Sequence, residues 1–214
     1  MSVLLYAIAE QGPRRIGGTG VGERPLREIA QDGLVAVVSD HERPPHTLAP
    51  AHVRAYESAL ERAMARGAML PARFGSVLAD DPAVNAMLAD RRGELAARLE
   101  AVRGAVELSV RAFARAPAAG PHASGTEYMR SRLEERRRAA AAARALRPLD
   151  ALAREVCEHD AAGDSLVRRS YLVDAARIEG FAARVAQLGD ELPELDLVCT
   201  GPWPPFSFAG APRP

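Results

Sequence analysis

Three of the five histidines lie close together, and they are the first residues to consider for metal chemistry. His41, His46 and His52 fall within the proline-rich segment HERPPHTLAPAH. Their spacings of five and six residues match no ligand pattern with a known mechanism, and no acidic or cysteine partner stands at a helical offset. The segment therefore predicts no metal site, and His52 is interpreted as a residue at the start of a helix.

The two cysteines are the next candidates, because a thiol near a histidine can act as a nucleophile. Cys157 stands two residues before His159 in a segment expected to be helical, where positions i and i+2 do not face each other. Cys199 follows Leu195 and Leu197 at every second position, which predicts that the three side chains point inward from one face of a strand. Both are interpreted as small apolar core residues, so no catalytic residue is predicted.

Two further segments have a composition that could bind phosphate or nucleic acid. The glycine-rich stretch GGTGVGERP is followed by no Lys-Ser or Lys-Thr pair and by no helix start, so it is a weak candidate phosphate loop. Residues 130–147 hold seven arginines against Glu134 and Glu135. No stacking aromatic residues are interleaved with them, which favours a solvated or protein-binding helix face over a nucleic-acid interface.

Composition narrows the classes of function further. The chain has 214 residues, 48% of them hydrophobic, which allows one large or two small domains. Its 28 basic residues, all arginine, balance 28 acidic ones, so there is no global field to attract nucleic acid or an anionic membrane. The N-terminal stretch MSVLLYAIAEQG is typical of a buried strand and not of a signal peptide. No apolar run is long enough for a membrane span. Two cysteines are too few for a secreted disulfide scaffold. We expect a cytoplasmic protein without a cofactor.

These residues must be positioned by a mixture of strands and helices. In the first half we expect a mobile Gly/Pro loop after the first strand, and Asp81 as the cap of the second helix. The expected strands are 3–9, 34–39, an interrupted segment at 68–78, and 106–111; the expected helices are 51–66 and 81–102. This order is close to the split β-α-β plan of ferredoxin-like domains with its first connection altered.

The second half begins after a low-complexity linker at residues 114–125, which is the candidate domain boundary. We expect a long helix to about Arg147, a further helical segment after Pro148, and a helix that Gly189 ends; strands are expected at 165–174 and 195–200. The predicted fold class is α+β with two domains. Residues 1–116 form a ferredoxin-like domain, and residues 124–214 form a modified ferredoxin-like α+β domain with a long helix and an extended proline/aromatic tail.

Two motifs remain unexplained by this architecture. In RFG, Arg73 follows a strand end beside an apolar Phe74, and either pairs with a core acid or points into a cleft. In GPWPPFSF, residues 201–208, the prolines hold the backbone extended and prevent it from pairing as a central strand. Trp203, Phe206 and Phe208 could pin the tail onto the fold, which we favour, or dock a partner.

These two motifs, taken with others in the same order, identify a resemblance. The chain closely resembles the gas vesicle protein family GvpL/GvpF over nearly its whole length. The shared segments are LLYAIAE, GLVAVVSD, His52 with Val53, Leu70 with Pro71, Arg73 to Gly75, GAVELSVRAF, GTEYM, RSYLVD and GPWPP with Ser207 and Phe208. The family commonly has Val where Ala72 stands and Tyr where Phe206 stands, which puts only a tyrosine hydroxyl contact in doubt.

The resemblance implies a non-enzymatic accessory protein of gas vesicle assembly, located in the cytoplasm and on the vesicle. Its implied partners are the small apolar shell protein and other accessory gas vesicle proteins, whereas self-association stays open. The candidate interface residues are Arg73, Phe74, Gly75, Trp203, Pro204, Pro205 and Phe206. The alternatives are a ferredoxin-like ligand- or haem-binding domain or enzyme, and a nucleic-acid-binding module that uses the arginine-rich helix.

Overall fold

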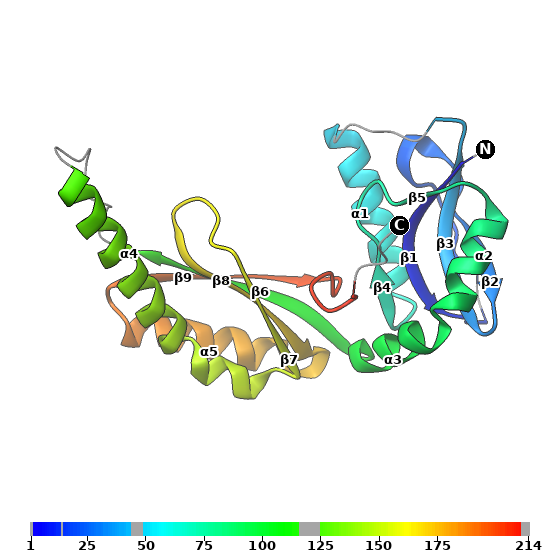
Figure 1. Ribbon diagram of the computed structural model, residues 1–214. Helices are drawn as coiled ribbons and strands as arrows, with labels where there is room; N and C mark the ends of the chain where they lie inside the picture. The colour runs from blue at the N-terminus through cyan, green and yellow to red at the C-terminus, as the bar shows by residue number, and fades with distance from the viewer. Residues whose placement is uncertain (1, 14, 44–48, 116–124, 211–214) are drawn as a thin grey trace. The chain divides into compact units, whose positions relative to one another are not determined.

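The chain divides into two compact units, each built around one β-sheet (Figure 1). The computed structural model describes residues 2–13, 15–43, 49–115 and 125–210, with only the backbone of residues 125–128. The first unit contains the described residues of Met1–Ala105 and of Pro204–Pro214, and the second unit is Val106–Trp203. The chain therefore leaves the first unit, forms the second, and returns to the first for its last residues.

The first sheet is antiparallel and has the strand order β2-β3-β1-β4, with β5 also paired to β1. Strand β1 is buried along most of its length because it lies in the middle of this sheet. The strands are β1 (Ser2–Glu10), β2 (Arg27–Gln31), β3 (Leu34–His41), β4 (Met69–Pro71) and β5 (Val77–Leu78). The sequence did not indicate β2, since its five residues, REIAQ, do not alternate between polar and apolar and follow closely on the glycine-rich segment.

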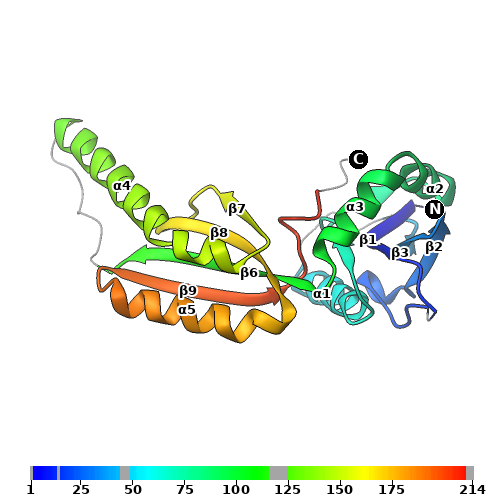
Figure 2. The same ribbon diagram turned by 90° about the horizontal axis from the view of Figure 1, so that it is seen from below.

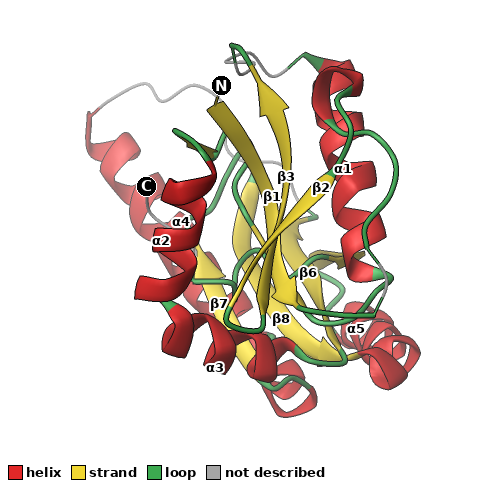
Figure 3. Ribbon diagram, turned by 90° about the vertical axis from the view of Figure 1, so that its right-hand side faces the viewer, coloured by secondary structure: helices red, strands yellow, loops and turns green. Residues whose placement is uncertain are grey.

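Helices cover both faces of the first sheet (Figure 3). Helix α1 (Pro50–Met64) begins with proline at its first turn and packs Tyr56 and Leu60 against one face. Helices α2 (Asp81–Asp90) and α3 (Arg92–Val102) lie against the other face. Helix α1 connects β3 to β4 across one face of the sheet, which agrees with the altered split β-α-β plan. That plan did not predict that α2 and α3 would cover the opposite face.

Two details of the helices α2 and α3 correct the sequence analysis. The cap is Asp80, whose carboxylate accepts a hydrogen bond from the Ala83 N–H at 2.9 Å, and Asp81 is the first helical residue. The single helix expected at 81–102 breaks at Arg91, which has non-helical backbone angles. Gly93 just beyond the break has low helix propensity, which favours two shorter helices.

The glycine-rich segment after β1, which was expected to be a mobile loop, is partly packed into the core. Val21 begins the 3-10 turn η1 (Val21–Glu23), is fully buried, and joins the cluster beneath α1. Gly20 lies so close to Tyr6 that a Cβ atom there would be 2.3 Å from the tyrosine hydroxyl oxygen. Glycine is therefore required at this position by close packing and not by a bound phosphate.

The second sheet has the strand order β7-β8-β6-β9, so its strands follow the same relative order as those of the first sheet. Strand β6 pairs with β9 and β7 pairs with β8, both antiparallel. The strands are β6 (Ala105–Ala114), β7 (Glu155–His159), β8 (Ser165–Asp174) and β9 (Leu195–Trp203). With its two intervening helices this unit has the full β-α-β-β-α-β order.

Two helices pack on one face of the second sheet (Figure 2). Helix α4 (Gly125–Ala145) contributes Ala142 to the core, and α5 (Ile178–Glu191) contributes an apolar side that includes Phe181. The short η2 (Arg147–Leu152) and η3 (Ala175–Arg177) lead into β7 and α5. Helix α5 continues past Gly189, which was expected to end it, because the backbone there keeps helical geometry.

The observed division differs from the predicted domains 1–116 and 124–214 at both ends. Strand β6 was assigned to the first domain, but its partner β9 lies in the second sheet. The last residues were assigned to the second domain, but Pro204–Pro214 groups with the first unit. Most of the candidate linker at 114–125 lies outside the described residues.

Candidate interaction sites

The RFG motif forms the turn between β4 and β5. The Ser76 N–H donates to the Arg73 carbonyl oxygen at 3.0 Å, and Gly75 has a φ of 84°, the left-handed conformation that such a turn favours at this position. Two hydrogen bonds to β1 hold the turn in place, from the Ala72 N–H to the Tyr6 carbonyl and from the Leu5 N–H to the Ser76 carbonyl, both 2.8 Å long. Gly75 is therefore explained by turn geometry alone.

Aromatic stacking positions Phe74 beneath this turn. The Phe74 ring meets Tyr56 edge-on with 5.2 Å between ring centroids, and Tyr56 stacks on Tyr6 at the same separation. The Tyr56 hydroxyl donates to the Ala72 carbonyl oxygen at 2.6 Å, and burial raises the pKa of Tyr56. Phe74 is half-buried and stabilises the fold, while the Arg73 side chain is exposed.

The tail after β9 is anchored to the first unit at alternate points. Pro204, Pro205 and Phe208 are buried, and a Cβ atom added to Gly210 would lie 3.5 Å from Arg98 Nε of α3. The Phe206 N–H donates to the Pro204 carbonyl oxygen at 2.7 Å, which closes a tight turn. Phe206 itself is 43% exposed. The predicted latch is thus correct for Phe208, whereas Phe206 does not bury its ring.

Trp203 ends strand β9, where it lies opposite Glu107 of β6. Its indole N–H donates to Thr200 Oγ at 3.4 Å, and its side chain is 48% exposed. The backbone before it is constrained, because Gly201 has a φ of 131° and a Cβ there would be 2.8 Å from the Glu107 carbonyl oxygen. The expectation that Trp203 lies buried across neighbouring surface is wrong, since β9 extends as an edge strand through this residue.

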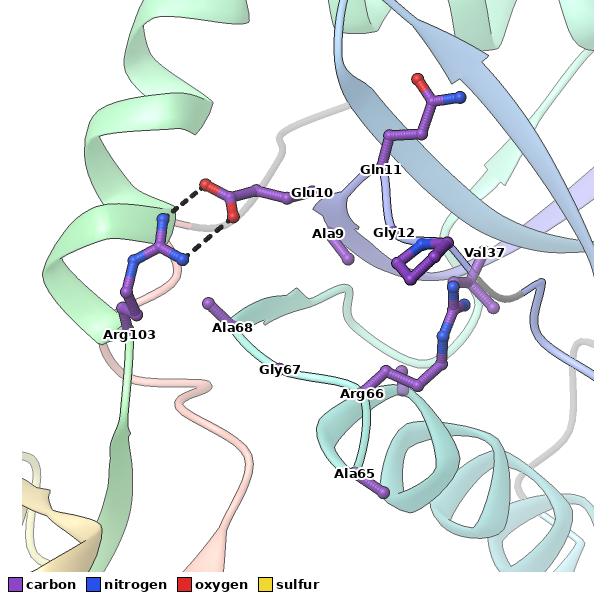
Figure 4. Close-up of a pocket in the computed structure, with 12 residues that line it drawn as sticks. Ala9, Glu10, Gln11, Gly12, Val37, Ala65, Arg66, Gly67, Ala68 and Arg103 are labelled. Carbon is purple, nitrogen blue, oxygen red and sulfur yellow. Dashed lines mark hydrogen bonds and ion pairs between the residues drawn. The ribbon is translucent and has the colours of Figure 1, made fainter.

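One feature that the sequence did not indicate is a cavity of about 350 Å³ in the first unit (Figure 4). It lies between the end of β1, the residues after α1, and Arg103 at the end of α3. Arg103 pairs with Glu10 at 2.6 Å, and Arg66 on the other side pairs with Glu28. Because both guanidinium groups already have carboxylate partners, the lining has little excess charge for a free anion. The sequence signal was the Arg-Gly pair that follows each helix, at residues 66–67 and 103–104.

His41 belongs to a buried chain of hydrogen bonds in the first unit. Its Nε2 lies 2.9 Å from Ser39 Oγ, which lies 2.8 Å from the Tyr6 hydroxyl; that hydroxyl accepts from the Val21 N–H. Burial lowers the pKa of His41, with Arg24 as a further cause. His52 lies in the first turn of α1, and His46 lies outside the described residues. Among the residues that the structure describes, no three potential metal ligands cluster.

Cys157 and His159 lie in strand β7, not in a helix, so the two side chains do share a face. The helical expectation is wrong because Leu149, Leu152 and Val156 mimic helical spacing across the end of η2 and the start of β7. His159 Nε2 is 2.8 Å from Ser170 Oγ. Burial, together with nearby glutamates, raises the pKa of the Cys157 thiol, which makes it a weaker nucleophile near neutral pH.

Cys199 packs on the core side of β9 against the main cluster of the second unit, as its alternation predicted. Burial raises the pKa of this thiol as well. In the part of the chain that the structure describes, no helix has the length and apolar composition needed to cross a bilayer.

The fold and these sites define a two-unit α+β protein whose candidate features are exposed aromatic groups and surfaces. Residues 2–210 match the family described as gas vesicle synthesis protein GvpL/GvpF, and the chain belongs to this family. It is 33% identical to gas vesicle protein F of Streptomyces sp. strain CB03234, over 97% of this chain and 99% of the relative. It is 30% identical to gas vesicle protein L of the same strain, over 91% and 86% of the two chains.

Solved structures agree with the fold. The crystal structure of gas vesicle protein GvpF from Anabaena sp. PCC7120 superposes with a TM-score of 0.80 at 19% identity and covers 99% of both chains. That of GvpF from Microcystis aeruginosa superposes with a TM-score of 0.79 at 21% identity, over 97% of this chain and 98% of the other. The arrangement of strands and helices is therefore shared along the whole length.

Proposed function

We propose that this chain is a non-enzymatic accessory protein of gas vesicle assembly that binds the shell protein, other accessory gas vesicle proteins, or both. Membership of the GvpL/GvpF family along nearly the whole chain supports a role in gas vesicle formation. In this proposal the protein acts in the cytoplasm and at the gas vesicle. Its interface residues are Trp203 to Phe206 and the turn Arg73 to Gly75.

The observation that carries a binding role is the geometry of the tail in the first unit. Phe206 is 43% exposed, while Pro205 before it and Phe208 after it are buried. A ring on a free terminus would lose much conformational entropy on binding, but here the anchored backbone has already lost it. Such a preorganised aromatic side chain can insert into an apolar pocket of a partner at low entropic cost.

The chemistry of the candidate nucleophile supports a role without catalysis. The Cys157 thiol has a raised pKa, and the adjacent His159 is engaged by Ser170. An activated cysteine needs a lowered pKa instead, from a nearby cation or a helix N-terminus. Binding of an aggregation-prone apolar subunit, in contrast, requires exposed apolar groups and no reacting group.

The test uses a gas-vesicle-forming host from which the gene has been deleted. Wild-type protein, Phe206→Ala, Trp203→Ala and Phe206→Tyr are returned separately with an affinity tag. We expect wild type and Phe206→Tyr to restore buoyant vesicles and to co-purify shell or accessory proteins, because tyrosine keeps the aromatic ring. Phe206→Ala and Trp203→Ala should retain less of these partners.

Thermal unfolding of each purified variant separates binding from stability. Both alanine variants remove exposed rings, so we expect their melting temperatures to stay close to that of wild type. An exposed arginine on α1, Arg54, provides the surface control, and Arg54→Ala should behave as wild type. Normal vesicles in the deletion host would rule out an assembly role, and undiminished capture by both alanine variants would rule out these interface residues.

A further inference from the structure

Helix α4 buries little of its own surface in the second unit. In Figures 1 and 2 its first turns extend past the strands of its own sheet. Among its described side chains, Met129 is 67% exposed and Leu133 is 50% exposed, whereas Ala142 near its end is buried. Met129 and Leu133 therefore contribute little to the core of this unit.

Three exposed apolar residues form one stripe along the helix. Leu133 lies four residues after Met129, and Ala140 lies seven residues after Leu133, so the three side chains project from the same side. The buried Ala142 and the half-buried Ala139 belong to the other side, which faces the sheet. We call Met129, Leu133 and Ala140 the α4 stripe. Its spacings of four and seven residues fit a helix that packs against another helix, with Arg136 at the position between Leu133 and Ala140 on this side.

Positive charge flanks the α4 stripe on both sides. Arg136 and Arg137 lie three and four residues after Leu133, and both are exposed. Met129 to Ala145 contains six arginines and two glutamates. Glu135 pairs with Arg132 at 3.2 Å, which leaves most of the other arginine side chains directed to solvent. Flanking charges of one sign select a partner helix with flanking charges of the opposite sign.

We propose that the α4 stripe binds an acidic amphipathic helix of a partner protein. Apolar residues of that helix would pack on Met129 and Leu133, and its flanking carboxylates would pair with Arg136 and Arg137. A second copy of this chain is a poor occupant, because two such helices would bring arginines together along the seam. Arginine suits these pairs, since its planar group can bind a carboxylate through two hydrogen bonds.

The composition of the helix favours a protein partner over nucleic acid or a membrane. Binding of single strands uses several aromatic side chains for base stacking, and the sequence of α4 has a single aromatic residue, Tyr128. A helix lying in a membrane interface needs a wide apolar face with large residues, but here the stripe is narrow and partly alanine. Methionine adapts its shape to an apolar partner surface, which suits recognition of a helix.

This inference deepens the proposed function and rests on it for the identity of the partner, but the stripe can be tested alone. The probe is a synthetic amphipathic helical peptide of the same length as α4, with leucine along its seam and glutamate on both flanks. A twin peptide carries lysine in place of glutamate. Fluorescence anisotropy of each labelled peptide is measured against the full chain, with a mixed-sequence oligonucleotide and anionic lipid vesicles as further probes.

Three variants make the result specific. Arg136→Glu/Arg137→Glu reverses the flanking charge, Leu133→Gln removes the apolar contact without changing charge, and Arg15→Glu/Arg54→Glu makes the same charge change on the first unit. All five positions carry exposed side chains, and circular dichroism checks that the helix content is kept. Leu133→Gln keeps the test informative if four consecutive glutamates at residues 134–137 unwind α4.

We expect saturable binding of the glutamate peptide, weakened at least about tenfold by the first two variants and unchanged in the third. The lysine peptide should bind only the charge-reversed chain. No binding of the glutamate peptide, equal binding by all variants, or arginine-dependent binding of only the oligonucleotide or the vesicles would overturn the inference. If the glutamate peptide binds as expected while vesicles form normally without the gene, the α4 stripe is supported and the assembly role fails. If the glutamate peptide does not bind while vesicles require the gene, the assembly role is supported and the inference about the α4 stripe fails.

Discussion

The first unit covers its sheet with helices on both faces, whereas the described helices of the second unit lie on one face of its sheet (Figures 1 and 3). The two sheets nevertheless share one relative strand order, β2-β3-β1-β4 and β7-β8-β6-β9. The connection after the first strand differs most. In the first unit it is a glycine-rich segment packed under α1, and in the second unit it includes the long helix α4.

This difference in coverage agrees with where the exposed apolar residues lie. Among the described residues, the large exposed hydrophobic side chains are Met129, Leu133, Val198, Trp203 and Phe206. Four of these belong to the second unit, and only Phe206 belongs to the first. One strand order thus occurs in a closed unit, whose sheet is covered on both faces, and in an open unit, whose described helices cover one face. The open unit exposes more of the large apolar side chains that partner proteins can bind.

The largest expected effect contrasts the core of the second unit with its exposed helix. Phe181 is 1% exposed and packs on Tyr171 with 5.1 Å between ring centroids. Phe181→Ala should lower the free energy of unfolding by about 3–5 kcal/mol, because it removes a buried ring and leaves a cavity. Leu133→Ala should change it by less than about 0.5 kcal/mol.

Urea unfolding followed by circular dichroism measures both variants. The fluorescence of Trp203, the only tryptophan and a residue of the second unit, reports on that unit separately. A loss of stability in Leu133→Ala comparable to that in Phe181→Ala would mean that α4 is covered in solution, and the contrast between a closed and an open unit would not hold.

A smaller effect is expected at the end of β9, the edge strand of the open sheet. Gly201→Ala should lower the free energy of unfolding by about 1–3 kcal/mol, because the residue has positive φ and its Cβ would lie close to the Glu107 carbonyl oxygen. Gly189 in α5 is the matched control, since a Cβ there meets no atom within 4 Å. Gly189→Ala should raise stability by up to about 1 kcal/mol through helix propensity. Equal effects in the two variants would show that Gly201 is not constrained as described.

Elements defined by local patterns could be predicted from the sequence. Strand β8 was predicted at its observed bounds, and α1 was predicted to within two residues at each end, because their patterns and end signals are contained in the segments themselves. Strand β6 was also predicted, but not its place in the second sheet. Sheet membership depends on β9, far along the chain, and no local pattern encodes that pairing.

The tail shows how far a candidate site could be predicted. The prolines and aromatic residues of GPWPPFSF indicated an anchored segment, and the burial of Phe208 agrees. Which rings face solvent follows from the turn at Pro204 and from the positive φ of Gly201, and residue types do not specify either. The exposure of Phe206 and Trp203 could therefore be found only from the structure.

The smallest expected effect tests a polar feature of the closed unit. Burial, together with Arg24 and His52, lowers the pKa of His41 below its ordinary value of 6.5, while Asp40 opposes this shift. The unfolded chain therefore binds more protons as pH falls through this range, so the free energy of unfolding should decrease from about pH 7.5 to about pH 5.5. The neutral His41 ring contributes its full stabilisation of the folded state at pH values above 6.5, the ordinary pKa of histidine.

A chain of hydrogen bonds connects His41 to the glycine-rich segment. The Tyr6 hydroxyl accepts from the Val21 N–H and lies 2.8 Å from Ser39 Oγ, which lies 2.9 Å from His41 Nε2. A protonated His41 ring can only donate to Ser39, so protonation restricts the hydrogen-bond arrangements that this chain can adopt. His41→Gln removes the titration, and the difference in unfolding free energy between wild type and variant should shrink as pH falls. A difference that stays constant over this range would show that His41 does not couple protonation to the packing of the glycine-rich segment.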